Sequence, residues 1–182
     1  MTVIDRRRFL QMGAGMALGA TAGATLLPRD VLAGIGNRTL NLYAINTQER
    51  LTADYWVDGW YSPDALHACN VLLRDRRTDE VTEMDPNLLD LVYLLHRQTG
   101  SREPVEIICG YRSPRTNARL AAQGRGVASN SYHVRGQAID LAVPGFNLSG
   151  LRQTAQSMEM GGVGYYPRAG FVHVDTGPVR TW

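Results

Sequence analysis

The sequence predicts an α+β domain in which helices flank an antiparallel sheet. Three observations support this fold class: two alternating runs near the start suggest a hairpin, strand-like and helix-like segments are mixed along the chain, and two further strands close it. A strict alternation of strands and helices would instead favour a doubly wound parallel sheet. The 182 residues, 44% of them hydrophobic and 20% charged, suit one domain with its own core.

Residues 1–33 resemble an export signal and not a part of the fold. Arg6 to Arg8 precede an uncharged stretch rich in Ala and Gly, residues 12–27, and Ala33 fits a signal-peptidase site. The apolar stretch is shorter than the roughly 20 residues that span a bilayer. We therefore predict a twin-arginine signal peptide over 1–33 and a single folded domain over 34–182, exported to the periplasm without stable membrane insertion and monomeric.

Composition excludes several classes of function. All 19 basic residues are arginine, so neither a Schiff-base lysine nor a phosphate-loop lysine is present. Beyond residue 33 the chain has fifteen arginines and fifteen acidic residues without a dense basic stripe, which argues against a nucleic-acid partner. Two cysteines are too few for a paired CxxC zinc site; a disulfide between Cys69 and Cys109 stays open.

The first half of the domain shows one hairpin and two helices. Residues 39–46 and 50–57 alternate apolar and polar side chains around a short turn at 47–48, which predicts two paired strands. Ser62-Pro63-Asp64 is a helix start, and this helix is expected to run to about Arg74. Asp85-Pro86 repeats that start, and leucines at helical spacing continue to Gly100.

The second half shows shorter elements separated by turns. A β-rich run at 105–109 ends at Gly110, Ser113-Pro114 begins a helix, and Arg112 lies in the turn between them. The Gly-, Ser- and Asn-rich residues 123–131 are expected to form a loop. The remaining expected elements are a strand at 138–143, a helix at 147–158 and strands at 162–166 and 171–176.

Asp140 stands out because it lies within the apolar strand expected at 138–143. Burying an unpaired carboxylate costs roughly several kcal/mol of free energy, so we expect a cation near this residue. The residue types leave two candidates for that cation, an arginine or a metal ion held jointly with histidines.

The segment 170–177 adds a second polar pair. On a strand, alternation places His173 and Asp175 on one face and the two valines on the other. Two histidines and one aspartate are enough to hold a tetrahedral zinc ion and leave its fourth position to water, as in a catalytic site. The competing interpretation is a chance polar pair on an exposed strand.

The sequence resembles the M15-type zinc peptidases, which share the fold of D-alanyl-D-alanine carboxypeptidases and of the hedgehog signalling domain. The pattern Ser131-x-His133-x-x-Gly136-x-Ala138-x-Asp140, followed by His173 in a Phe-Val-His-Val-Asp strand, carries the likeness. Residues 110–113 and 161–168 extend it over nearly the whole chain. Within that family the chain is most similar to the murein endopeptidase K branch.

The resemblance implies a zinc ion held by His133, Asp140 and His173, with Arg112 facing the substrate. Zinc polarises a scissile carbonyl and lowers the pKa of water so that hydroxide forms near neutral pH. Arg112 would stabilise the developing oxyanion or hold a substrate carboxylate.

The chain departs from the family at one position. Many relatives have an acidic general base three residues before the last zinc histidine, but here that residue is Gly170. Asp175, expected on the same strand face as His173, is the substitute that we predict as general base. The swapped assignment, with Asp175 as ligand and His173 as base, stays open, although imidazole is the commoner metal ligand.

The expected function is a zinc-dependent murein endopeptidase that hydrolyses peptide cross-links between the stem peptides of peptidoglycan. The resemblance favours the 3-3 link between two diaminopimelate residues; 4-3 links, or trimming by a carboxypeptidase, are neighbouring possibilities. The alternative is a zinc-containing binding or interaction domain of the hedgehog-like fold without turnover, which the missing acid at Gly170 supports.

Overall fold

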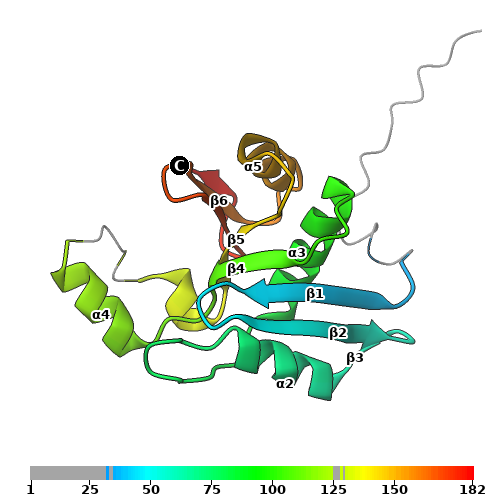
Figure 1. Ribbon diagram of the computed structural model, residues 1–182, viewed down its shortest axis with the longest axis horizontal. Helices are drawn as coiled ribbons and strands as arrows, with labels where there is room; N and C mark the ends of the chain where they lie inside the picture. The colour runs from blue at the N-terminus through cyan, green and yellow to red at the C-terminus, as the bar shows by residue number, and fades with distance from the viewer. Residues whose placement is uncertain (1–31, 33–34, 125–127, 129) are drawn as a thin grey trace, which may run out of the picture.

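The structure is a computed structural model that describes residue 32, residues 35–124, residue 128 and residues 130–182 (Figure 1). The predicted signal peptide, apart from Leu32, lies outside the described residues, as does part of the predicted loop at 123–131. In the described part of the chain, no helix combines the length and the apolar character needed to cross a bilayer.

A single sheet of eight strands forms the centre of the domain, in the order β3-β2-β1-β4-β5-β7-β6-β8. The α+β prediction is confirmed. Most neighbours are antiparallel, but β1 pairs with β4 and β6 with β8 in parallel, which the sequence did not predict. The strands are β1 (Arg38–Ala44), β2 (Glu49–Val57), β3 (Trp60–Tyr61), β4 (Val105–Cys109), β5 (Ala138–Ala142), β6 (Gly162–Tyr166), β7 (Phe171–Asp175) and β8 (Arg180–Thr181).

The predicted hairpin is confirmed as β1 and β2. Leu42 lies opposite Leu51 and Ala44 opposite Glu49 in the antiparallel pair. Gln48 adopts a left-handed φ of 61° in the turn, and its backbone N–H donates to the carbonyl oxygen of Ala44. Alternate β1 residues are buried, so the hairpin contributes one apolar face to the core.

Within residues 35–124 and 130–182, four α-helices accompany the sheet, and each begins where a capping side chain was predicted. The caps Ser62, Asp85, Ser113 and Asn147 all accept a backbone N–H of the first turn. The helices are α2 (Pro63–Leu72), α3 (Pro86–Thr99), α4 (Pro114–Ala122) and α5 (Leu148–Ser157). The first of them ends two residues before the expected Arg74, whereas α3 ends at Gly100, whose φ of 64° suits glycine.

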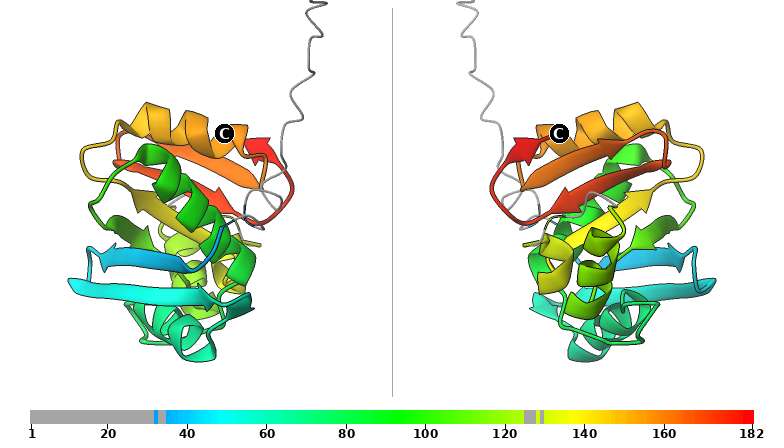
Figure 2. Two further views of the ribbon diagram at one scale, coloured as in Figure 1. Left: turned by 90° about the vertical axis from the view of Figure 1, so that its right-hand side faces the viewer. Right: turned by 90° about the vertical axis from the view of Figure 1, so that its left-hand side faces the viewer.

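The core joins the helices to the sheet. The leucines of α3 are buried together with the inner residues of β1, β4, β5 and β7. Helix α3 contacts α5 and β1, and α5 contacts β6 and β7. Figure 2 shows both helices beside the sheet, with α2 at the end of the molecule formed by the hairpin.

The register of the central strands brings polar residues into one row. Cys109 at the end of β4 lies opposite Asp140 of β5, Asp140 lies opposite His173 of β7, and His173 lies opposite Gly164 of β6. Just before β5, the 3-10 helix η2 (Tyr132–Arg135) carries His133 to this row. Residues from β4, from η2 with the following β5, and from β7 therefore meet at the middle of the sheet.

Candidate metal centre

Asp140 is only 6% exposed and is surrounded by imidazoles. Its Oδ1 atom lies 2.8 Å from Nδ1 of His173 and 3.2 Å from Nε2 of His133. Within the described part of the chain, these two rings are its ion-pair partners and no arginine is. Of the two cations left open by the sequence, the structure favours a metal ion over an arginine.

A backbone carbonyl sets the tautomer of His133. The buried ring directs Nδ1 towards the carbonyl oxygen of Gly110 at 2.8 Å, so the proton of this nitrogen is donated there. The lone pair on Nε2 is then left facing Asp140. The backbone N–H of Arg112 donates to the carbonyl oxygen of His133, which ties η2 to the turn after β4.

A carboxylate sets the tautomer of His173. Its Nε2 lies 3.0 Å from Oδ2 of Asp175 and its Nδ1 2.8 Å from Oδ1 of Asp140. In the tautomer that donates Nε2–H to Asp175, the lone pair of Nδ1 faces Asp140. Asp175 is fully buried and is itself held by the guanidinium of Arg180 at 2.7 Å and by the backbone N–H groups of Gly162 and Gly177. This is the carboxylate–histidine arrangement that orients metal-binding imidazoles.

The three facing atoms fit the ligand set of one metal ion. Nε2 of His133 and Nδ1 of His173 are 3.2 Å apart, and Oδ1 of Asp140 lies within 3.2 Å of both. With bonds near 2.0–2.1 Å, ligands of a tetrahedral zinc ion are separated by about 3.3 Å. With both rings neutral, two nitrogen lone pairs and one carboxylate oxygen converge in this way, so the donor set suits a cation.

The pKa shifts within the cluster also favour a bound cation. Burial works against the charge on Asp140, but His133 and His173 outweigh it and hold the pKa of this carboxyl well below its usual range. Burial also opposes protonation of His133, yet the neighbouring Cys109 and Asp140 raise the pKa of its ring. Both shifts show that the buried cluster attracts positive charge, which a divalent cation supplies.

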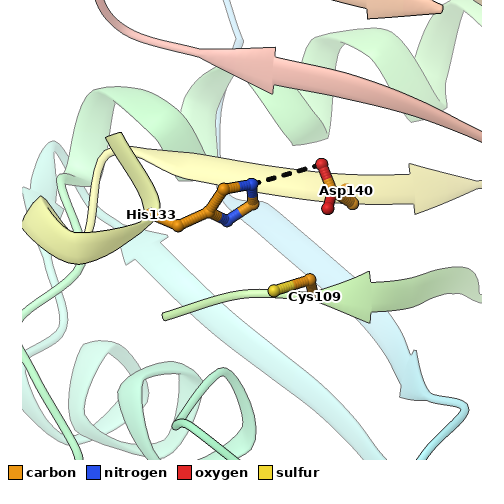
Figure 3. Close-up of side chains that lie close together, drawn as sticks. All are labelled: Cys109, His133 and Asp140. Carbon is orange, nitrogen blue, oxygen red and sulfur yellow. Dashed lines mark ion pairs between the residues drawn. The ribbon is translucent and has the colours of Figure 1, made fainter. Parts of the chain in front are cut away.

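Cys109 also belongs to this cluster. Its Sγ atom and the ligand atoms of His133 and Asp140 lie within 4.8 Å of one another, and Figure 3 shows the three side chains converging from β4, η2 and β5. Sequence analysis did not assign a role to Cys109, since only the pairing of β4 with β5 brings it to Asp140. The disulfide left open is not formed: Cys69 and Cys109 are both free thiols.

Arg112 lies beside the cluster, in the turn between β4 and α4. Its guanidinium donates from Nη1 to Oδ1 of Asn117 at 3.3 Å and from Nη2 to Sγ of Cys109 at 3.7 Å. The side chain is partly buried and forms no ion pair with Asp140 in the described structure. Arg112 therefore brings a positive charge next to the cluster without neutralising its carboxylate.

The position of Asp175 does not fit the general-base role expected for it. The sequence correctly places Asp175 on the same strand face as His173, but the carboxylate binds Nε2 of that ring, on the side away from Asp140. Asp175 has no exposed surface and accepts bonds from Arg180. The swapped assignment would need Asp175 to reach the same ion as Asp140, whereas the two carboxylates contact opposite nitrogens of the His173 ring.

The C-terminal residue also borders the site. The indole of Trp182 packs on Gly164, where an added Cβ would lie 2.7 Å from the ring, and its centroid is 5.2 Å from that of His173. Its Nε1 donates to the hydroxyl of Tyr166 at 2.7 Å, and half of its surface is exposed. Sequence analysis gave Trp182 no role beyond the overall resemblance, because the short β8 that positions it has no recognisable pattern.

Comparisons with known proteins agree with this geometry. The family model described as "Peptidoglycan L,D-endopeptidase MepK", of the M15 peptidases, matches residues 33–182. The chain is 45% identical to the probable peptidoglycan L,D-endopeptidase MepK of Haemophilus influenzae, over 98% of this chain and 95% of that protein. It is 42% identical to the peptidoglycan L,D-endopeptidase MepK of Escherichia coli K12, over 98% and 97%. The chain therefore belongs to the MepK family of M15 peptidases and is a metallopeptidase.

Proposed function

We propose that the chain is a zinc-dependent endopeptidase that hydrolyses peptide cross-links of peptidoglycan in the periplasm, as a monomer. One observation carries this proposal: two imidazole lone pairs and a buried carboxylate oxygen, from His133, His173 and Asp140, converge within 3.2 Å of one another. Such a donor set holds a catalytic ion with three protein ligands and leaves a position for a reactant.

In this proposal His133, Asp140 and His173 hold the zinc ion. When bound there, the ion supplies Lewis acidity towards a peptide carbonyl and a low pKa for water. Asp175 is a positioning residue: its bond to Nε2 keeps the ring of His173 in the tautomer that presents Nδ1. The carbonyl oxygen of Gly110 does the same for His133.

Arg112 is the residue that we propose for contact with the substrate. A guanidinium is always protonated and presents a planar set of donors, which suits a carboxylate of a stem peptide or the oxyanion that develops at the scissile carbonyl. Its place beside Cys109, next to but not paired with Asp140, leaves that charge for the substrate.

We propose the 3-3 cross-link as the preferred bond, with the 4-3 link as the competitor. The relatives are named L,D-endopeptidases. The 3-3 link joins an L-configured to a D-configured centre of two diaminopimelate residues, whereas the 4-3 link joins two D-configured centres. The name of the relatives therefore supports the 3-3 link.

The proposal includes export. Residues 1–33 act as a twin-arginine signal that is removed after Ala33, and residues 34–182 form the periplasmic enzyme. The twin-arginine route carries folded proteins, so the metal would be loaded before translocation. The test is to replace Arg6 and Arg7 by lysine and to compare the cellular fractions: retention of the uncleaved chain in the cytoplasm is expected, and unchanged export contradicts this route.

A specific observation favours a second candidate, a zinc-containing peptidoglycan-binding domain without turnover. Gly170 stands where the family resemblance implies an acidic base, and the expected substitute Asp175 contacts His173 on the side away from Asp140. In this candidate the same three side chains hold the ion for structure, and Arg112 contributes to binding alone.

One experiment separates these candidates. Residues 34–182 are incubated with purified sacculi that contain both 3-3 and 4-3 links, before and after dialysis against a chelator, and the released muropeptides are separated by chromatography. We expect loss of 3-3 dimers with the zinc-loaded protein, no loss after chelation and recovery with added zinc. Undiminished muropeptide release without metal contradicts a zinc-dependent enzyme. Preferential loss of 4-3 dimers makes the 4-3 link the preferred substrate. No release by the zinc-loaded protein supports the binding domain without turnover.

A matched variant controls for the histidine substitutions. His67 lies on α2 and is exposed, unlike the two histidines of the cluster. His67→Ala is expected to keep bound zinc and activity, whereas His133→Ala is expected to lose both. Equal behaviour of the two variants contradicts the ligand assignment.

A further inference from the structure

Cys109 brings a thiol to the centre that the proposed function assigns to three ligands. It is the last residue of β4 and lies directly opposite Asp140 in the antiparallel pair with β5. Its Sγ atom lies within 4.8 Å of a ring nitrogen of His133 and of a carboxylate oxygen of Asp140 (Figure 3). The thiol therefore occupies the end of the row whose other members are Asp140 and His173.

The other contacts of the thiol are weak. Sγ lies 3.7 Å from the carbonyl oxygen of Gly110 and 3.7 Å from Nη2 of Arg112. Neither contact requires a sulfur atom at this position, and both leave Sγ on the side of His133. A zinc–sulfur bond near 2.3 Å would place Sγ about 3.6 Å from the other ligand atoms, closer than the 4.8 Å within which Sγ lies of His133 and Asp140.

We propose that Cys109 is a fourth protein ligand of this metal centre, which closes the coordination sphere when no substrate is bound. This inference rests on the metal centre of the proposed function. Binding replaces the S–H bond by a sulfur–metal bond and releases one proton to solvent, so the step needs no oxidant or reductant. Two nitrogens, one oxygen and one sulfur then form a closed tetrahedral set, which is typical of a resting rather than a reactive site.

A closed set has two consequences for this enzyme. The thiolate binds zinc strongly, so it retains the ion when the substrate is absent. Hydrolysis requires Sγ to leave, so the substrate competes with the thiol for the fourth position. Cys109 thus acts as an internal inhibitor: it strengthens zinc binding, and it blocks the coordination position that the substrate needs.

The test uses cobalt(II) as a spectroscopic substitute for zinc in residues 34–182. We compare the wild-type protein, Cys109→Ser and the control Cys69→Ser; Cys69 is the other free thiol and is buried in the core. We expect a near-ultraviolet sulfur-to-cobalt charge-transfer band in the wild type and in Cys69→Ser, and none in Cys109→Ser. The visible d–d bands of tetrahedral cobalt are expected in all three proteins.

Each result bears on a different step. Visible bands without the sulfur band in the wild type overturn the role of Cys109 and leave the three-ligand centre intact. Loss of the sulfur band in Cys69→Ser would show that the sulfur ligand is Cys69 and not Cys109, which also overturns the inference. Absence of both sets of bands from the wild type overturns the metal centre itself, and with it the proposed function.

A second measurement does not depend on the spectrum. Competition of the wild type, Cys109→Ser and Cys109→Ala with a chromophoric zinc chelator gives the affinity of each for the ion. We expect the affinity of both variants to fall by about tenfold or more, because one ligand is lost. Unchanged affinity in the alanine variant, which folds as judged by circular dichroism, contradicts the inference.

Discussion

The domain buries two aspartates to the same extent but surrounds them with opposite chemistry. Asp90 is 5% exposed and Asp140 is 6% exposed. Asp90 accepts from Nη1 of Arg38 at 2.7 Å and from the hydroxyls of Tyr55 and Tyr61 at 2.8 Å each. All three neighbours are donors, so the charge is compensated within the protein.

The donors around Asp90 keep their protons. Burial, reinforced by the charge of Asp90, raises the pKa of Tyr55 well above its ordinary value and that of Tyr61 to about 12. Both hydroxyls therefore remain donors at physiological pH. The carboxylate of Asp90 is therefore satisfied by Arg38, Tyr55 and Tyr61 and has no need of a further cation.

Asp140 has two imidazoles in place of such permanent donors. The ring of His133 donates Nδ1–H to Gly110 and the ring of His173 directs Nε2 to Asp175, so each neutral ring can turn a lone pair towards the carboxylate. The comparison teaches that burial of a carboxylate does not by itself mark a site. The mark is a buried carboxylate whose neighbours have already given their protons to other acceptors.

The largest expected effect comes from changing Asp140. Asp140→Asn replaces an anionic ligand by a neutral amide of the same size, so bound zinc should fall below about a tenth per chain and hydrolysis of sacculi should fall by at least about 100-fold. Metal analysis and muropeptide release measure the two quantities. One zinc per chain in this variant would show that Asp140 is not a ligand.

The same substitution at Asp90 should act on stability instead. Asp90→Asn leaves the buried Arg38 without its anion, which we expect to lower the free energy of unfolding by about 3–5 kcal/mol. Denaturant unfolding of the metal-free proteins measures this loss, and it should exceed that of Asp140→Asn. Zinc content and activity of the folded variant should match those of the wild type. Loss of metal at normal stability would show that Asp90, and not only Asp140, supports the metal centre.

Asp175 lies between these two cases, because it is donor-saturated like Asp90 but acts on the metal cluster through His173. We expect Asp175→Asn to lower zinc affinity by about 10- to 100-fold, the usual cost of losing the partner that orients a metal-binding imidazole. Chelator competition measures the affinity, with Asp58→Asn in an exposed turn as the control. Unchanged zinc affinity with loss of turnover would instead restore the general-base role.

The fold was predictable where local chemistry decides the structure. Capping residues before prolines located the starts of α2, α3 and α4, and alternation located the strands of the hairpin. The two-residue strands β3 and β8 were missed because so few residues show no periodicity. The parallel pairing of β1 with β4 depends on long-range packing, which local patterns do not encode.

The site was predictable to the level of strand faces. Alternation correctly placed His173 and Asp175 on one face, and the apolar strand around Asp140 directed attention to this buried carboxylate, whose cation stays a prediction. The rotation of the His173 ring determines which nitrogen faces Asp140, and no sequence pattern reports a ring rotation. Likewise, the approach of Cys109 depends on the register between β4 and β5.

The smallest expected effect concerns the two arginines of the compared clusters. Arg38 forms an ion pair with Asp90. The guanidinium of Arg112 instead contacts Asn117 and Cys109 and forms no ion pair with Asp140 in the described structure. If the charge of Arg112 serves the substrate, Arg112→Lys keeps that charge but loses the planar set of donors.

We expect kcat/KM of Arg112→Lys for 3-3 muropeptide dimers to fall by about tenfold, which corresponds to about 1.4 kcal/mol of transition-state stabilisation, with one zinc per chain retained. Arg115→Lys, with a side chain that is 75% exposed on α4, is the matched control and should behave as the wild type. Wild-type kinetics in Arg112→Lys would contradict a substrate contact that needs the guanidinium. Loss of zinc would show instead that Arg112 supports the metal cluster through Cys109, which would bring it closer to the role that Arg38 has beside Asp90.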